Sequence, residues 1–377
     1  MQFLLIPDSF KGSLSATEVT QIMSDCIEKV LPRSNYTTFP FSDGGEGALD
    51  TLVEKAAGKL IFCDSVDALN RKINKPYFMF EKEATAWIEL SQCAGLVGIE
   101  KKRQNPLNTS TLGVGHQIKH ALDLGCRKII LGIGGSATHD LGAGIFVALG
   151  GQLLDHRGHA VFPSGGNLNR VYKIDNSLID SRIEQTEFVI ACDVNNPLLG
   201  EKGAAYVYAT QKGASSNMIK TLETNGAHLI QLIEHLNGQR LNSIEGGGAA
   251  GGVAAGLKGL LDAQITNGFD LLSKKTALEK ALQKATIIFT GEGRFDGQSA
   301  AGKLPHKIAQ WGDEQKKITF IFAGSVDPLV EQDKLSANIR LINCKPEHQN
   351  TEEAMKFAKQ NLQNRVLSIL NELKKLD

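Results

Sequence analysis

The segment Leu131-Gly-Ile-Gly-Gly-Ser-Ala-Thr-His-Asp-Leu-Gly-Ala-Gly-Ile145 decides the fold class of this chain. The apolar, β-branched run over 128–133 predicts a strand, the two glycines predict a turn, and residues 143–149 return to helical spacing. A strand–turn–helix junction of this kind directs backbone N–H groups outward, which suits an anionic ligand. Ser136 and Thr138 add hydroxyl groups to the same turn.

Four further polar or glycine-rich loops follow apolar runs of their own, at residues 7–12, 42–47, 193–197 and 291–296. A single loop of this composition is usually only a turn between two elements. Five of them, each at the end of an apolar run, indicate an active site assembled from loops.

The two ends of the chain share one pattern. Strands are predicted at 3–6, 36–41, 286–290, 318–323 and 339–343, each followed by a loop and most by a helical pattern. The helix that follows the first loop has a clear start, because Ser15 and Glu18 have the spacing of a capping box. A long amphipathic helix is predicted over 353–373 and is expected to cover the sheet.

The middle of the chain lacks this alternation. Strands predicted at 59–65, 76–80 and 84–90 follow one another without helices, which is typical of a mixed sheet. We therefore predict an α/β protein. A doubly wound, parallel-sheet (Rossmann- or flavodoxin-like) domain is built from both chain ends, residues 1–65 and 286–377, and a second, mixed α/β domain of residues 66–285 is inserted, with a cleft between them.

Composition limits the classes of function. The 377 residues favour two domains, and the 41 basic and 41 acidic residues cancel, which argues against a general nucleic-acid surface. No apolar run approaches the roughly 18 residues of a membrane helix. The apolar start of the chain is too short and too uncharged for a signal peptide.

The six cysteines are scattered without a Cys-x-x-Cys pair, which favours a reducing compartment. We expect a cytoplasmic protein in which Cys26 and Cys126 are small buried hydrophobes.

Several known motifs match by letter and fail in context. Residues 297–303 have Walker-A spacing, but Leu304 stands where a Ser or Thr should bind magnesium. Residues 246–251 match the dinucleotide fingerprint, but no convincing strand precedes them, so close helix packing is the preferred interpretation. This weighs against a dehydrogenase. No histidine cluster has zinc-ligand spacing.

The remaining candidates are carboxylates and cations on the glycine loops: Asp8, Asp43, Glu46, Asp193, Glu292 and Asp296, beside Lys11, Lys212, Arg294 and Lys303. Carboxylates for Mg²⁺, cations for phosphate oxygens and exposed N–H groups are the parts that phosphoryl transfer requires. A carboxylate near the acceptor hydroxyl would complete such a site as general base.

These residues resemble one family over residues 3 to about 325. The matching segments are Ile6-Pro-Asp-Ser-Phe-Lys-Gly-Ser13, Ser42-Asp-Gly-Gly-Glu-Gly47, Asn105-Pro106, Leu131-Gly-Ile-Gly-Gly-Ser-Ala-Thr138, Ala191-Cys-Asp193, Asn196-Pro197, Gln211-Lys-Gly-Ala214, Gly248-Ala-Ala-Gly-Gly252, Thr290-Gly-Glu-Gly-Arg294 and Asp296-Gly-Gln298. Together and in this order they look like the bacterial glycerate kinases, and more narrowly like the type that forms 2-phosphoglycerate.

The resemblance implies phosphorylation of D-glycerate by ATP with Mg²⁺, in a cleft between two domains. Three positions depart from the usual pattern: His139 replaces an Asn, Leu141 replaces a Gly, and Thr210 replaces a Pro. None of these changes removes a charge that the reaction needs, so they bear on fine substrate preference. Which hydroxyl is phosphorylated and which domain holds the nucleotide stay open at this point.

The expected roles are as follows. Asp193 takes the proton from the glycerate hydroxyl, and Lys11 and Arg294 neutralise the transferring phosphate or the substrate carboxylate. Asp43, Glu292 and Asp296 are the magnesium candidates. The expected substrate and phosphate ligands are Asp8, Ser9, Asn105, Gly134, Gly135, Ser136, Thr138, Lys212 and Lys303.

The expected partners are the small molecules D-glycerate and ATP, without nucleic acid or membrane, and the protein is expected to be a monomer or a homodimer. The alternative from another class is a non-catalytic sensor that binds a small hydroxy acid in the same cleft.

Overall fold

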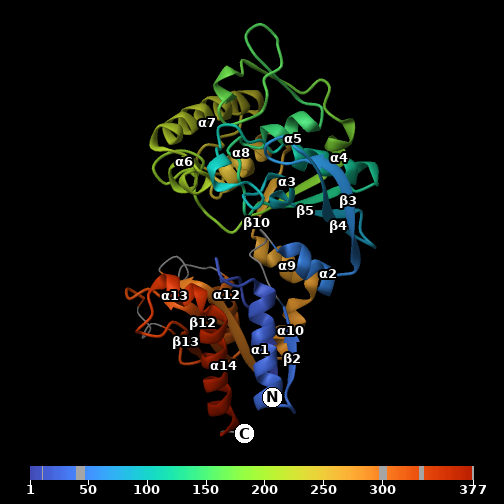
Figure 1. Ribbon diagram of the computed structural model, residues 1–377. Helices are drawn as coiled ribbons and strands as arrows, with labels where there is room; N and C mark the ends of the chain where they lie inside the picture. Colours follow the sequence, from blue (N-terminus) through green and yellow to red (C-terminus); the bar gives the residue numbers. More distant parts are fainter. Residues whose placement is uncertain (11, 40–46, 297–303, 331–334, 376–377) are drawn as a thin grey trace. The chain divides into compact units, whose positions relative to one another are not determined.

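The computed structural model describes residues 1–10, 12–39, 47–296, 304–330 and 335–375 (Figure 1). Its internal contacts divide the chain into two compact units. Unit 1 consists of Met1–Asp43 and Ser273–Asp377, and unit 2 consists of Gly44–Leu272. Within the described ranges, no helix combines the length and the apolar character needed to cross a bilayer.

Unit 1 is built on a parallel sheet. Its strands are β1 (Gln2–Leu5), β2 (Asn35–Thr38), β11 (Ile287–Phe295), β12 (Ile318–Val326) and β13 (Ile339–Asn343), in the order β13-β12-β11-β1-β2. Strand β1 pairs on one side with β2 and on the other with β11, so the direction of winding reverses between β1 and β11. In open sheets of this kind, ligands bind beyond the carboxyl ends of the strands at such a reversal.

Helices cover both faces of this sheet. On one face, α1 (Ala16–Val30) and α14 (Ala358–Lys374) lie side by side over a cluster that contains Phe289 and Phe320 (Figure 1). On the other face, α12 (Leu304–Glu314) packs on β11 and β12, while α10 (Leu278–Lys284) contacts β1. The predicted capping box of α1 is confirmed, because the Glu18 N–H donates to Ser15 Oγ and the Ser15 N–H donates to the Glu18 carboxylate.

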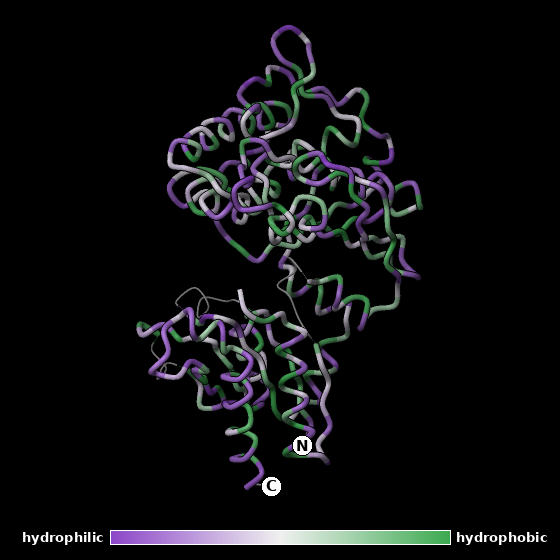
Figure 2. Tube along the Cα trace, viewed as in Figure 1, coloured by the Kyte–Doolittle hydropathy of each residue, from purple (hydrophilic) through white to green (hydrophobic). Residues whose placement is uncertain are grey.

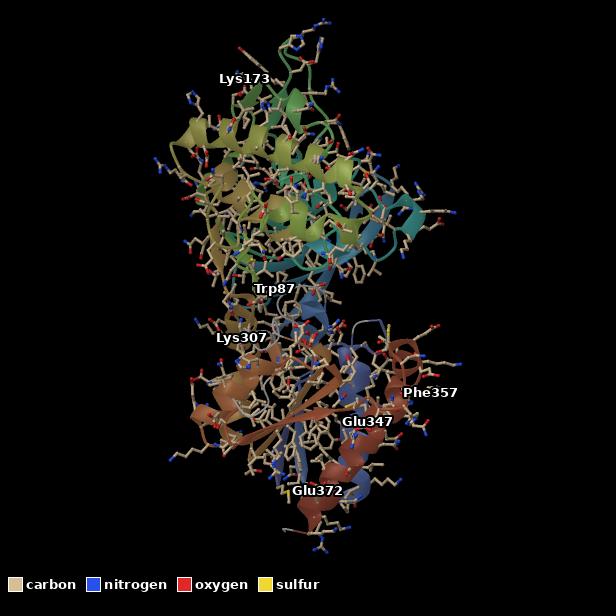
Figure 3. All side chains as sticks on the ribbon, turned by 90° about the vertical axis from the view of Figure 1, so that its left-hand side faces the viewer. Trp87, Lys173, Lys307, Glu347, Phe357 and Glu372 are labelled. Atoms are coloured by element: carbon tan, nitrogen blue, oxygen red, sulfur yellow. The ribbon has the colours of Figure 1, made fainter. Side chains whose placement is uncertain are left out.

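The helix predicted over 353–373 is two helices. Helix α13 (Thr351–Lys356) begins at an Asn350 cap, and the chain leaves helical geometry at Phe357 before α14 begins. Phe357 is partly exposed at this break (Figure 3). Toward the C-terminus, the tube alternates between hydrophilic and hydrophobic colours, as expected of a helix with one buried face (Figure 2).

Unit 2 has the mixed sheet that the sequence predicted. Its strands are β3 (Gly58–Val66), β4 (Lys72–Phe80), β5 (Thr85–Glu89), β6 (Lys128–Gly132), β9 (Glu187–Ala191) and β10 (Gln264–Thr266), in the order β10-β9-β6-β5-β4-β3. The β3–β4 and β4–β5 pairs are antiparallel, and the other neighbours are parallel. A separate short pair, β7 (Gln152–Leu154) with β8 (Lys173–Asp175), is antiparallel.

The helices of unit 2 are α2 (Ala48–Lys55), α3 (Leu90–Ala94), α4 (Leu112–Asp123), α5 (Ala143–Ala148), α6 (Ala204–Tyr208), α7 (Ser216–Asn237) and α8 (Ala249–Leu261), and α9 (Gly268–Thr276) spans the boundary between the units. Short 3₁₀ turns are η1 (Lys101–Arg103), η2 (Leu168–Arg170), η3 (Ser181–Gln185) and η4 (Thr210–Lys212). Helices α3 to α8 contribute residues to one hydrophobic cluster with the sheet. Trp87 of β5 is completely buried (Figure 3). Cys126 lies in the hydrophobic cluster of unit 2, and Cys26 lies in that of unit 1. The interpretation of these two cysteines as buried hydrophobes is confirmed.

The predicted domain boundaries differ from the division of the structure. The sequence placed residues 1–65 and 286–377 together, but the units separate after residues 43 and 272. Residues 58–66 belong to unit 2, because β3 pairs with β4 from Gly58 opposite Phe80 to Val66 opposite Lys72. At the other boundary, α10 belongs to unit 1, because it packs on β1. Both corrections depend on long-range pairing that local patterns do not encode.

Candidate active site

The parallel strands of unit 2 end together. Glu89 at the end of β5 lies opposite Gly132 of β6, which in turn lies opposite Ala191 of β9. The segments that follow these strands therefore leave the sheet at one edge. This edge carries the β6–α5 loop (residues 133–142) and Asp193, two of the five loops singled out in the sequence.

The β6–α5 loop is held in place by a short backbone pairing. The Leu96 N–H donates to the Gly135 oxygen (3.0 Å), and the Ala137 N–H donates to the Ala94 oxygen (2.8 Å). Ser136, between these two bonds, has its own N–H directed away from the paired segment. Gly135 adopts a φ of 69°, a left-handed conformation that glycine accepts without strain.

Several N–H groups of this loop have no acceptor in the described part of the chain. They belong to Gly134, Gly135, Ser136 and Thr138. Ser136 and Thr138 are nevertheless buried. Buried N–H groups are nearly always paired in proteins, so a run of open donors at a strand end is a suitable place for an anion.

Lys212 lies against this loop from the η4 turn. Its Nζ donates to Ser136 Oγ and to the Thr138 carbonyl oxygen, both at 2.7 Å, and the side chain is 1% exposed. Burial lowers the pKa of Lys212 to about 7, and the Asp140 carboxylate opposes this shift. When Lys212 is charged it can only donate, so Ser136 Oγ accepts, and the Ser136 hydroxyl proton is left for another acceptor.

Asp140 anchors the far end of the loop. One carboxylate oxygen accepts the Thr111 N–H (2.7 Å), the Thr111 hydroxyl (2.8 Å) and the Gly144 N–H (3.2 Å). Burial raises the pKa of Asp140, and these hydrogen bonds counter the rise. The carboxylate thus joins the loop to the first turns of α4 and α5.

The start of α8 packs directly on the same loop. Ala250, Gly251 and Gly252 are left-handed, and a side chain at Gly251 would collide with the Thr138 oxygen. The Leu141 N–H donates to the Gly251 oxygen (3.2 Å). The glycine-rich segment therefore allows close packing, as predicted in preference to dinucleotide binding.

Two buried side-chain atoms of the loop have no hydrogen-bond partner among the described groups. They are Thr138 Oγ1 and His139 Nδ1. Burial, and then the charge of Lys212, lower the pKa of His139 to about 3, so its imidazole is neutral at physiological pH. The residue that departs from the family pattern at this position thus adds no charge to the loop.

The other predicted residues of unit 2 differ in placement. Asp193 is half-buried and follows β9, where the neighbouring Cys192 N–H donates to the Thr266 oxygen (2.9 Å). The Oδ1 of Asn105 accepts the Leu107 N–H (3.0 Å) in a local turn. The structure gives the Asn105 side chain this turn-forming contact.

In unit 1, the predicted residues lie where β1 and β11 end. The Asp8 N–H donates to the Gly291 oxygen (2.9 Å), and its carboxylate accepts the Ser9 N–H (2.6 Å). Glu292 is buried in β11. Arg294 is 66% exposed and is paired with Asp327 at 2.8 Å. The predicted residues Lys11, Asp43, Glu46 and Lys303 lie outside the described residues.

The donor chemistry of Glu292 and Asp296 fits magnesium, which prefers oxygen ligands. The field of Asp296 acts on the pKa of both Arg294 and Asp327, so these charges share one edge of the sheet. No group of three or more potential His, Cys, Asp or Glu ligands occurs within the ranges that the structure describes. Magnesium commonly binds through one or two carboxylates together with substrate phosphates, which suits the pair.

Three residues of these edges were missed by the sequence analysis as site components: Glu89, Asp140 and Asp327. The signal for Glu89 was available, because it is the charged residue at the end of an apolar run over 84–90. Asp327 offered no local signal for its pairing with Arg294, which is distant in sequence. Asp140 lies in the loop that the sequence singled out, but its bonds to Thr111 come from a distant segment.

Comparison with known proteins places these features in one family. The family model described as Glycerate kinase family matches residues 3–374. A glycerate kinase of Bacillus cereus is 36% identical over 96% of this chain and 95% of its own length. A glycerate 2-kinase of Escherichia coli is 36% identical over 86% of both chains. The crystal structure of a protein assigned as glycerate kinase 2 from Salmonella typhimurium LT2 has a TM-score of 0.80 and 34% identity, covering 100% of this chain and 98% of that one. On this evidence, the chain belongs to the glycerate kinase family.

Proposed function

We propose that this kinase transfers the γ-phosphoryl group of ATP to a hydroxyl of D-glycerate, with Mg²⁺, and forms 2-phospho-D-glycerate and ADP. The observation that carries this proposal is the β6–α5 loop. Open N–H groups, the Ser136 hydroxyl and the buried Lys212 ammonium converge at the carboxyl edge of a parallel sheet. A small anionic substrate or a transferring phosphoryl group is the ligand that such a set of donors suits.

Asp193 is proposed as the general base. It follows β9 at the edge that also carries the β6–α5 loop. A carboxylate there takes the proton of the acceptor hydroxyl as the oxygen attacks phosphorus. General-base catalysis of this kind contributes about 10²–10⁴ in rate.

Charge stabilisation is proposed for the loops of unit 1. Glu292 and Asp296, with Asp43, would hold Mg²⁺, which when bound neutralises charge on the phosphate oxygens. Lys11, Lys303 and Arg294 would contribute positive charge to the same oxygens, Arg294 with a guanidinium that can grip two oxygens at once. Asp8 and Ser9, at the end of β1, are proposed to orient the bound phosphate or substrate.

The first experiment is to measure ADP release from MgATP with D-glycerate, with L-glycerate and D-lactate as controls. Turnover with D-glycerate alone supports the proposal, and ³¹P–¹H coupling in the product then distinguishes the 2-phosphate from the 3-phosphate. Binding of D-glycerate without ADP formation would instead favour a sensor, and turnover of D-lactate would reassign the substrate.

A further inference from the structure

Glu89 has an unusual position for an acidic residue. It is the last residue of β5, lies opposite Gly132 of β6 and is 1% exposed. It therefore places a carboxylate in the interior of unit 2, at the edge from which the β6–α5 loop departs. No role was expected for it from the sequence.

Its carboxylate closes the first turn of a helix that is distant in sequence. Oε1 accepts the Leu49 N–H at 2.8 Å, and the N–H of Gly47 is also hydrogen-bonded to the carboxylate. Oε2 accepts the Gln92 amide at 3.2 Å. Gly47 is the N-cap of α2 and has no side chain to cap it, so Glu89 supplies from 40 positions away the acceptor that this helix end requires.

Helix capping alone does not require this charge. A single neutral acceptor satisfies an N-cap, and an ionised carboxylate is costly to bury. Burial raises the pKa of Glu89 to about 7, against the hydrogen bonds that lower it. The charge of Asp50 on α2 raises the pKa of Glu89 further.

Three donors from two elements meet on the two oxygens of Glu89. An amide has a single acceptor oxygen, so a glutamine would leave at least one of these donors without a partner. Given the glycerate kinase activity proposed above, on which this inference rests, we propose that Glu89 is a positioning residue. It fixes the start of α2 against the strand edge that bears the β6–α5 loop.

The test uses Glu89→Gln and Glu89→Asp in the full-length protein. Glu234→Gln is the matched control, because the Glu234 carboxylate also accepts two backbone N–H groups, from Leu241 (2.6 Å) and Asn242 (3.0 Å), beyond the end of α7. We would measure kcat, KM for MgATP and for D-glycerate, the pH profile from 5.5 to 9, and thermal unfolding.

Glu89→Gln is expected to lower kcat or raise KM by about 10–100-fold, the size of effect that follows when a residue that orients a site is lost. Glu89→Asp, which keeps the charge but shortens the reach, should show a smaller loss. The control should change neither. Activity per folded molecule equal to wild type in both Glu89 variants would overturn the inference and leave Glu89 as a helix cap.

Hydrogen exchange of residues 47–55 separates this inference from the proposed function. Faster exchange at the start of α2 in Glu89→Gln, and not in Glu234→Gln, is expected whatever the substrate proves to be. If the wild-type protein does not turn over D-glycerate, the proposed function is wrong, but the exchange experiment still tests whether Glu89 anchors the start of α2. Unchanged exchange at residues 47–55 in Glu89→Gln would show that Glu89 does not anchor this helix.

Discussion

The ammonium of Lys212 lies 2.7 Å from the hydroxyl oxygen of Ser136, although the two residues are 76 positions apart in sequence. The bond fixes the direction in which Ser136 can donate, because a charged lysine offers donors alone. It also places a positive charge immediately behind the open N–H groups of the β6–α5 loop. Lys212 was expected to bind phosphate directly, and the structure adds a supporting contact to Ser136.

Replacing Lys212 with Met should weaken kcat/KM for D-glycerate by about 10–100-fold, because hydrogen bonds to a charged group contribute about 1.5–3 kcal/mol. Lys220→Met, at an exposed position of α7, is the control and should leave kcat/KM unchanged. Steady-state kinetics at saturating MgATP measure both variants. An unaltered kcat/KM in Lys212→Met would show that the loop binds its ligand without this charge.

The buried Lys212 should also make the stability of the protein depend on pH. Burial lowers the pKa of Lys212 from 10.5 to about 7. Between these values the unfolded chain binds more protons than the folded one, so the free energy of unfolding contributed by this group rises with pH from about 7 to 10.5. Urea unfolding should show this rise in wild type relative to Lys212→Met. Parallel profiles for the two proteins would mean that Lys212 keeps its ordinary pKa.

Anion binding next to Ser136 should reverse part of that shift. A negative charge close to Lys212 favours its protonated form, so the pKa of Lys212 should rise when D-glycerate binds, and a proton should be taken up near pH 8. Calorimetry in two buffers with different ionisation enthalpies measures this uptake. Lys212→Met should lose it. Equal binding enthalpies in both buffers for wild type would place the ligand away from Lys212.

The local elements were predictable because their signals are local. Apolar runs located most strands of the two sheets, although β10 was not predicted, and the spacing of Ser15 and Glu18 located the start of α1. The division of the chain was not predictable in the same way. Residues 58–66 read as a strand in either domain, and only their pairing with β4 assigns them to unit 2.

In the candidate site, too, the sequence indicated the type of site but not the contacts between distant residues. The composition of the Gly134–Asp140 turn indicated an anion site, and the structure brings Ser136, Thr138 and Lys212 together there. No pattern in the sequence joins Glu89 to Leu49 or Arg294 to Asp327, because each contact depends on how distant segments pack. Roles for residues in loops can be proposed from composition, but their partners require coordinates.

Asp193→Asn should lower kcat by about 10²–10⁴ and leave the binding of D-glycerate largely unchanged, because the amide keeps the size of the side chain and loses its basicity. Asp270→Asn, an exposed aspartate of α9, is the control. Single-turnover measurement of ADP formation separates the chemical step from product release. A kcat within a few-fold of wild type would remove Asp193 from the role of base.

Arg294 and Asp327 allow a test of charge placement in unit 1. Their ion pair is largely exposed on the arginine side, so it should contribute no more than about 1 kcal/mol to stability. Arg294→Lys keeps the charge but removes the planar fork, and should raise KM for MgATP if the guanidinium grips phosphate oxygens. Asp327→Asn releases the guanidinium from its partner and should leave KM unchanged or lower it. If KM and kcat stay at wild-type values in Arg294→Lys, the pair with Asp327 is the whole role of this arginine, and its assignment to phosphate is wrong.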